Sequence, residues 1–98
     1  MKATEIVAPQ RRVTKKGNIM DVRVWRVPVS KHYPKGINYS FQLISKGKRV
    51  LGYDNNTGEG HHKHYLKNGV LVKKETKFES WAEMFKQFEK DVREFESK

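Results

Sequence analysis

The fold is decided by residues 80–97, which read SWAEMFKQFEKDVREFES. Ser80 precedes Glu83 by three residues, the spacing of a capping box that begins an α-helix. The large apolar residues that follow recur at helical spacing and line one face, while charged residues cover the other. Because that apolar face is unstable in water, we expect it to pack on another layer of the same chain. Its members are Trp81, Met84, Phe85, Phe88, Val92 and Phe95.

The segments before this helix alternate between apolar and polar residues, which is the period of β-strands. Residues 19–29 place Val22 and Val24 on one face, and Pro28 ends the capacity of this segment to donate to a sheet. Residues 37–45 form a second long strand with large apolar side chains on one face. Shorter strands are expected at 11–15, 49–54, 61–66 and 70–73, with tight turns at Lys16-Gly17-Asn18, Lys46-Gly47-Lys48 and Asn68-Gly69.

Several strands followed by one amphipathic helix predict an α+β fold. We expect a mainly antiparallel sheet of about five to six strands, packed against one long C-terminal helix. Residues 1–98 should form a single domain, with the sheet in residues 11–77 and the helix in residues 80–97. Residues 1–10 show no period, and we expect them to fray or to pair at a sheet edge.

The chain is strongly basic, with 21 lysines and arginines against 11 acidic residues and a formal net charge of +10. The excess lies before the helix, since residues 1–80 contain 17 basic and 6 acidic side chains. A small protein of this charge attracts polyanions, of which nucleic acid is the commonest. The alternative is a lysine content that only keeps the protein soluble.

Cysteine is absent, which excludes disulfides and thiolate metal ligands and fits a reducing compartment. No apolar run reaches the roughly 20 residues of a membrane span. Residues 1–10 lack the apolar core of a signal peptide. We therefore expect a cytoplasmic protein with no membrane partner.

Three of the four histidines lie close together, at His61, His62 and His64. Because side chains alternate along a strand, His62 and His64 share one face, and His61 and Lys63 share the other. Asp54 precedes a short glycine-bearing loop that could bring it back beside either pair. Histidine titrates near neutral pH, so a cluster of this density suits proton transfer or metal binding.

Three interpretations of the cluster are open. In the first, His62 and His64 supply the base and the acid that metal-free RNA cleavage needs, Lys63 and a nearby arginine stabilise the phosphate charge, and Asp54 fixes one imidazole tautomer. In the second, His62 and His64 bind a divalent metal with Asp54 or Glu59 as a third ligand. In the third, the same residues lie on a solvent-facing strand and have no chemical role. We expect the protein to have no cofactor, and of the three interpretations the metal site is not favoured.

The loop Lys31-His32-Tyr33-Pro34-Lys35, with Arg23 and Arg26 on the preceding strand, interleaves cations with aromatic residues, a mixture that suits phosphate contact and base stacking. In the alternative interpretation Trp25 and Tyr33 are simply packed. The residues expected to contact nucleic acid, here and near the histidines, are Arg23, Arg26, Lys31, Tyr33, Lys35, Arg49 and Lys63.

The motif Tyr53-Asp54-Asn55 is followed, after a short gap, by Gly60-His61-His62-Lys63-His64. Together with Asn38-Tyr39-Ser40-Phe41 and Arg49-Val50-Leu51-Gly52, it resembles the pattern of TumE-type toxins, small proteins of bacterial and archaeal toxin–antitoxin loci. The likeness extends upstream through residues 21–28 and downstream through residues 78–80 into the helix. Residues 66–77 depart from the pattern, because this segment is longer and richer in lysine.

The resemblance implies a toxin that is neutralised by an antitoxin encoded in the adjacent gene. RNA cleavage follows by analogy with other small basic toxins. We therefore predict a toxin that cleaves or binds RNA; the alternative is a non-catalytic nucleic-acid-binding or regulatory module. The expected partners are RNA or another nucleic acid and the antitoxin. A homodimer, in which a second copy of the chain is the partner, is a further alternative. The residues to which the resemblance carries over are Tyr53, Asp54, Asn55, His61, His62 and His64, of which Asp54 and the histidines are the candidate catalytic residues.

Overall fold

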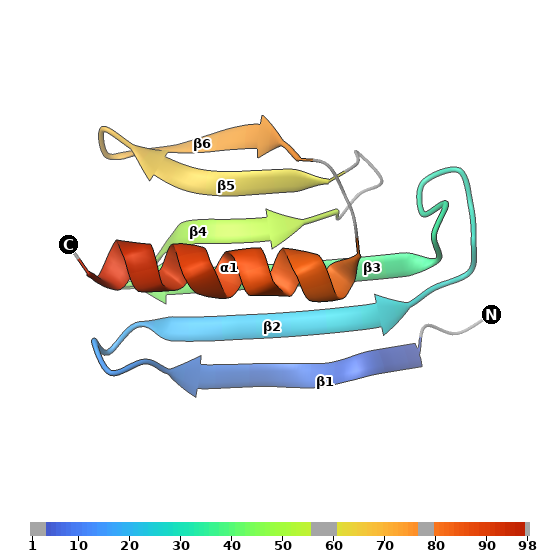
Figure 1. Ribbon diagram of the computed structural model, residues 1–98, viewed down its shortest axis with the longest axis horizontal. Coiled ribbons are helices and arrows are strands. Elements are labelled where there is room, and N and C mark those ends of the chain that lie inside the picture. The colour runs from blue at the N-terminus through green and yellow to red at the C-terminus, as the bar shows by residue number, and fades with distance from the viewer. Residues whose placement is uncertain (1–3, 56–60, 77–79, 98) are drawn as a thin grey trace.

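The structure, a computed structural model, describes residues 4–55, 61–76 and 80–97. Six antiparallel strands follow one another across a single sheet in the order in which they occur in the sequence (Figure 1). Each strand therefore pairs with its neighbours in the chain, as in a meander. The strands are β1 (Thr4–Val13), β2 (Ile19–Arg26), β3 (Ile37–Ser45), β4 (Lys48–Asp54), β5 (His62–Lys67) and β6 (Val70–Glu75).

One helix, α1 (Trp81–Glu96), packs against one face of this sheet and contacts β3 and β4 (Figure 1). The Ser80 side chain accepts a hydrogen bond of 3.1 Å from the backbone N–H of Glu83, which confirms the predicted N-cap. The predicted α+β fold, a mainly antiparallel sheet against one C-terminal helix, is confirmed. In the described residues no second helix covers the opposite face of the sheet, which we call the open face.

The core lies between α1 and the central strands, and its members follow the predicted alternation except at Val50 and Leu51, which are adjacent and lie opposite a register shift in β3. Val22 and Val24 of β2 are buried, while Arg23 between them is exposed. Aromatic rings pack together at the centre of the core. The ring centroid of Phe41 lies 5.4 Å from that of Phe85 and 5.8 Å from that of Phe88. The buried apolar residues are Val22, Val24, Tyr39, Phe41, Leu43, Val50, Leu51, Tyr53, Met84, Phe88 and Val92.

Two hairpin turns have the expected conformation. Lys46 and Gly47 have φ angles of 52° and 76°, and Asn68 and Gly69 have 54° and 79°. Two successive positive φ angles match the type I′ turns that suit the twist of antiparallel strands. The predicted turns at these positions are confirmed.

The strand ends differ from those expected. β1 begins at Thr4 rather than Arg11, because residues 4–10 pair with β2 at the sheet edge, which is one of the two outcomes expected for residues 1–10. Register shifts on both sides of Val7 explain why no regular alternation is visible there. β2 ends at Arg26, and the chain then forms a loop in which the N–H of Val27 donates to the carbonyl of Gly36 at 2.9 Å.

A buried carboxylate joins the helix to the sheet. The Tyr53 hydroxyl donates to Asp91 Oδ2 at 2.5 Å, and Lys63 Nζ lies 2.9 Å from the same oxygen. Gln87 donates to Asp91 Oδ1 at 3.0 Å, so both carboxylate oxygens are engaged. Burial, and then the hydrogen bond to Asp91, raise the pKa of Tyr53, so its hydroxyl remains a donor. This network ties α1 to β4 and β5.

Replacing Asp91 should therefore destabilise the fold. In Asp91→Ala, the Tyr53 hydroxyl and the Lys63 ammonium lose their acceptor in a mostly buried place. We expect the free energy of unfolding to fall by about 2–3 kcal/mol, as measured by urea denaturation.

Lys90→Ala is the matched control, because Lys90 lies on the same helix and is exposed. Its free energy of unfolding should stay within about 0.5 kcal/mol of wild type. Equal stability of Asp91→Ala and Lys90→Ala would show that the network does not hold the helix to the sheet.

Candidate functional site

The open face is made of the residues of β2 to β5 that alternate with the core. Strand register aligns them in rows across the sheet: Arg23 pairs with Ser40, Ser40 with Asp54, and Asp54 with His62. A second row joins Asp21, Gln42, Gly52 and His64. Polar and charged groups thus gather on the side of the sheet away from α1. The open-face residues include Asp21, Arg23, Trp25, Asn38, Ser40, Gln42, Gly52, Asp54, His62 and His64.

Asp54 is the centre of a charged cluster on this face. Its Oδ2 lies 3.1 Å from His64 Nε2 and 3.9 Å from Arg49 Nη1. The side chains of Asp54 and His64 are only 11% and 12% exposed, whereas that of Arg49 is 32% exposed. A carboxylate, an imidazole and a guanidinium therefore meet at one point, as the sequence predicted for Asp54 and one histidine.

Gly52 leaves the space in which the Arg49 side chain lies. A Cβ atom at Gly52 would be 3.6 Å from Arg49 Cδ and 3.3 Å from the carbonyl oxygen of Phe41. Because the side chain of Arg49 passes over this glycine, its guanidinium can approach Asp54, five positions further along the chain. Gly52 is thus a positioning residue for the cluster.

The environment of His64 favours the neutral imidazole. Burial is the largest cause that lowers its pKa from the ordinary 6.5; the charge of Arg49 lowers it further, and so does that of Lys73. Asp54 opposes this shift through its charge and its hydrogen bond, but the net direction is downward. A neutral imidazole that donates from Nε2 to Asp54 has Nδ1 as its proton acceptor. His64 can therefore act as a base near neutral pH.

The three clustered histidines do not form one site. His61 lies on the α1 side of the sheet, where its Nδ1 is 2.9 Å from the Tyr39 hydroxyl and its ring stacks on that of Tyr39 at 5.6 Å between centroids. Burial raises the pKa of Tyr39, and the charge of Asp54 adds to the effect. The phenol thus stays protonated beside His61, whose own pKa is lowered by burial and then by His62. His62 is buried beside Asp54 on the open face.

The two neighbours of Asp54 in the motif hold the sheet together. Asn55 is buried; its Oδ1 accepts from the backbone N–H of Tyr39 at 3.0 Å, and its Nδ2 donates to the carbonyl of Ile37 at 2.7 Å. Tyr53 is bound to Asp91, as described above. These contacts fix the end of β4, and so the position of Asp54.

The residues expected to contact nucleic acid are distributed over both faces. Arg23 lies on the open face, but Arg26 alternates to the α1 side. Lys63 is also on the α1 side, where it pairs with Asp91 and lies over the rings of Tyr53 and Tyr65. In the loop between β2 and β3, Lys31 and Lys35 are exposed and Tyr33 is half-buried.

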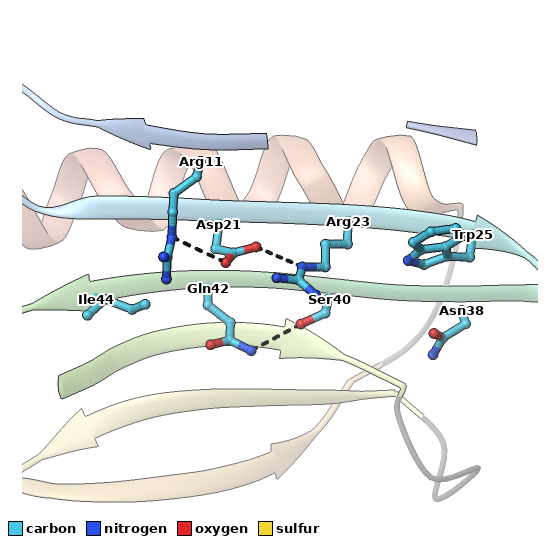
Figure 2. A pocket seen from close by; sticks show the side chains of 8 residues that line it. All are labelled: Arg11, Asp21, Arg23, Trp25, Asn38, Ser40, Gln42 and Ile44. Carbon is cyan, nitrogen blue, oxygen red and sulfur yellow. Dashed lines mark hydrogen bonds and ion pairs between the residues drawn. The ribbon is translucent and has the colours of Figure 1, made fainter. Parts of the chain in front are cut away.

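A polar pocket on the open face escaped the sequence analysis. Its volume is about 350 Å³, and the lining side chains come from β1, β2 and β3. Figure 2 shows these side chains on the near side of the sheet, with α1 behind it. The sequence signal for this pocket was that Asp21, Arg23 and Trp25, which alternate with the buried valines of β2, combine charged and aromatic side chains. The lining residues are Arg11, Asp21, Arg23, Trp25, Asn38, Ser40, Gln42 and Ile44.

Within the ranges 4–55, 61–76 and 80–97, no three histidine or acidic residues are arranged to hold a metal ion. Glu59, the alternative third ligand, lies outside the described residues, as do Asn56 to Gly60 of the expected glycine-bearing loop. In the same described ranges, no helix is long and apolar enough to cross a membrane.

The fold and the open face define a small basic α+β protein with a polar surface on one side of its sheet. The chain belongs to the TumE toxin family: the family described as Toxin TumE matches residues 2–96. The resemblance seen in the sequence is thereby confirmed, and membership indicates the toxin component of a toxin–antitoxin system, with an antitoxin as partner. Comparisons with curated proteins and with solved structures gave no match.

The lowered pKa values of His61 and His64 predict a stability that falls in mild acid. Below the ordinary value of 6.5, the unfolded chain binds protons that the folded chain does not yet bind. The contribution is fully present above pH 6.5 and is lost as the pH falls from there through the folded-state pKa values. Urea midpoints at about pH 7.5 and about pH 5.5 should differ in this direction.

The double variant His61→Gln/His64→Gln tests the assignment, since it removes both groups and should flatten this part of the pH dependence. His32→Gln, in an exposed loop, is the control and should leave it unchanged. An unaltered pH dependence in the double variant would assign the effect to other groups.

Proposed function

We propose that this toxin acts on RNA, that RNA binds across the open face, and that His64 with Asp54 provides the base for metal-free cleavage. The observation that carries the proposal is the 3.1 Å contact between His64 Nε2 and Asp54 Oδ2 beside Arg49. A carboxylate that orients a neutral imidazole is a common arrangement of a general base.

Charge supports RNA as the polyanion. The formal net charge is +10, and the open face and its margins carry Arg11, Arg23, Arg49 and Lys73 beside the carboxylates Asp21, Asp54 and Glu75. Cations in this arrangement contact phosphates and supply affinity that does not depend on sequence. Polar side chains between them can contact sugars and bases.

The proposed chemistry uses the 2′-hydroxyl of RNA. His64 Nδ1 takes the proton of that hydroxyl, the oxygen attacks the adjacent phosphorus, and the bond to the 5′ oxygen breaks to leave a 2′,3′-cyclic phosphate. Arg49 stabilises the negative charge that develops on the phosphoryl oxygens. His62 is the second imidazole on this face and the candidate that protonates the departing 5′ oxygen.

A non-catalytic RNA-binding toxin is the second candidate, and the burial of the pair favours it. The side chains of Asp54 and His64 are 11% and 12% exposed, and Arg49 already neutralises Asp54. In this case the cluster stabilises the sheet, and RNA is bound without being cut.

Cleavage and growth arrest together test the catalytic proposal. His64→Gln retains a hydrogen-bonding side chain but loses the titrating imidazole. We expect cleavage of cellular RNA to fall about 100-fold or more and growth arrest on expression to be relieved. RNA binding by the purified variant should be retained, which separates loss of chemistry from loss of the fold.

His32→Gln is the matched control, because it removes a histidine from an exposed loop, and it should arrest growth like wild type. If wild type binds RNA and arrests growth without cleaving it, the non-catalytic candidate is correct. If His64→Gln still cleaves RNA at the wild-type rate, His64 is not the base.

Two arginines of β2 test whether RNA binds to the open face or to the α1 side of the sheet. Arg23→Gln and Arg26→Gln remove the same charge from opposite faces of β2. Arg23→Gln should reduce the magnitude of the salt slope of RNA binding, log K against log salt, by about 0.7. Arg26→Gln should leave the slope near that of wild type, as measured by fluorescence anisotropy with a labelled RNA. Equal effects of the two variants would contradict binding to the open face.

A further inference from the structure

The polar pocket on the open face has features that a single charged surface lacks. It is a trough over β2 and β3 in which Trp25 stands at one end and Arg11 near the other (Figure 2). Its volume, about 350 Å³, falls within the usual range of small-ligand sites, about 300–1,000 Å³. The pocket therefore has room for one nucleotide unit.

Asp21 organises the basic part of the trough. Arg23 Nε donates to Asp21 Oδ1 at 3.1 Å, and Arg11 Nε lies 3.6 Å from Asp21 Oδ2. The Asp21 side chain is 15% exposed, whereas those of Arg11 and Arg23 are 66% and 54% exposed. Because these contacts use the Nε atoms, the Nη groups can still donate to a phosphate. Two guanidinium groups around one carboxylate leave a net positive charge.

Trp25 is the aromatic residue at one end of the trough. It pairs across the sheet with Asn38, and both side chains line the trough (Figure 2). Trp25 is half-buried, so part of the indole is accessible on a face that α1 does not cover. Indole rings on a sheet surface stack on unpaired bases, because every base has an aromatic face. Ser40 and Gln42 add polar groups along the same trough, where Gln42 Nε2 donates to Ser40 Oγ at 3.2 Å.

The trough is close enough to the Asp54 cluster to share an RNA strand with it. Arg23 is aligned with Ser40, and Ser40 with Asp54. Two strand spacings separate Arg23 from Asp54, which is about 10 Å. One single-stranded RNA could therefore occupy both places without bending around the sheet.

From these four observations we propose that the trough is a nucleotide subsite of the open face. A base of single-stranded RNA stacks on Trp25, and its phosphate is bound by Arg11 and Arg23, which Asp21 holds in place. The inference rests on the proposed function in that RNA is the ligand of this face, but it requires no cleavage. Purines stack over a larger area than pyrimidines, so oligoadenylate should bind more tightly than oligouridylate.

Tryptophan fluorescence tests this subsite. The two tryptophans are Trp25 and Trp81, so Trp81→Phe leaves Trp25 as the only source of tryptophan emission. The probe is a short oligoadenylate with 2′-O-methyl groups, which the proposed reaction cannot cleave. Trp81→Phe should be quenched as the probe binds, whereas Trp25→Phe should show little change in emission from Trp81. In Trp25→Leu, the dissociation constant from anisotropy should rise about 10-fold.

Mononucleotides separate stacking from phosphate binding. Adenosine monophosphate should quench Trp25 in Trp81→Phe, and inorganic phosphate should not. Equal effects of the two would overturn the stacking contact. Circular dichroism of each variant shows whether the fold is kept, and Trp25→Phe gives a second, milder change at the same position.

The outcomes distinguish this inference from the proposed function. If wild type binds the oligoadenylate and Trp25→Leu binds it equally well, the subsite is rejected, while RNA binding to the open face stands. If wild type binds no RNA by anisotropy, both the subsite and the proposed function are rejected. If binding is weakened in Trp25→Leu but cleavage is absent from wild type, the subsite stands and the catalytic proposal fails.

Discussion

A single helix can cover only one face of a six-stranded sheet, and this constraint determines the rest of the molecule. The face under α1 is built from aromatic and branched side chains, and the buried Asp91 ties it to the helix through Tyr53 and Lys63. The other face must be stable in water, so most of its residues are polar or charged. A sheet covered on one side thus has a broad, regularly spaced surface away from the helix, and here that surface carries both guanidinium groups and carboxylates.

The sequence predicted this architecture well because each layer has a strong local signal. The helical spacing after Ser80 and the alternation around Val22 and Phe41 each depend on burial against a neighbouring layer. The turns at Lys46-Gly47 and Asn68-Gly69 follow from the positive φ angles that such residues tolerate. β1 was the exception, because register shifts around Val7 interrupt the alternation that would have revealed the strand.

The candidate site was predicted only in part. Alternation correctly separated His62 and His64 from His61 and Lys63, and the expected approach of Asp54 to one histidine is present for His64. Residue type could not tell which cations lie on the open face, since Arg26 and Lys63 lie on the α1 side. Nor could it find the pocket around Trp25, because that pocket joins residues of three strands whose alignment depends on register.

The meander order of the strands has a consequence for how the protein is made. Each strand pairs with the one synthesised immediately before it, so the sheet can assemble through short, rapid loop closures. The apolar face nevertheless stays uncovered until α1, which follows all six strands, has left the ribosome. During that interval the nascent sheet exposes aromatic surface to chaperones and to any partner already present. An antitoxin made earlier would therefore meet an incomplete toxin whose later core is still accessible.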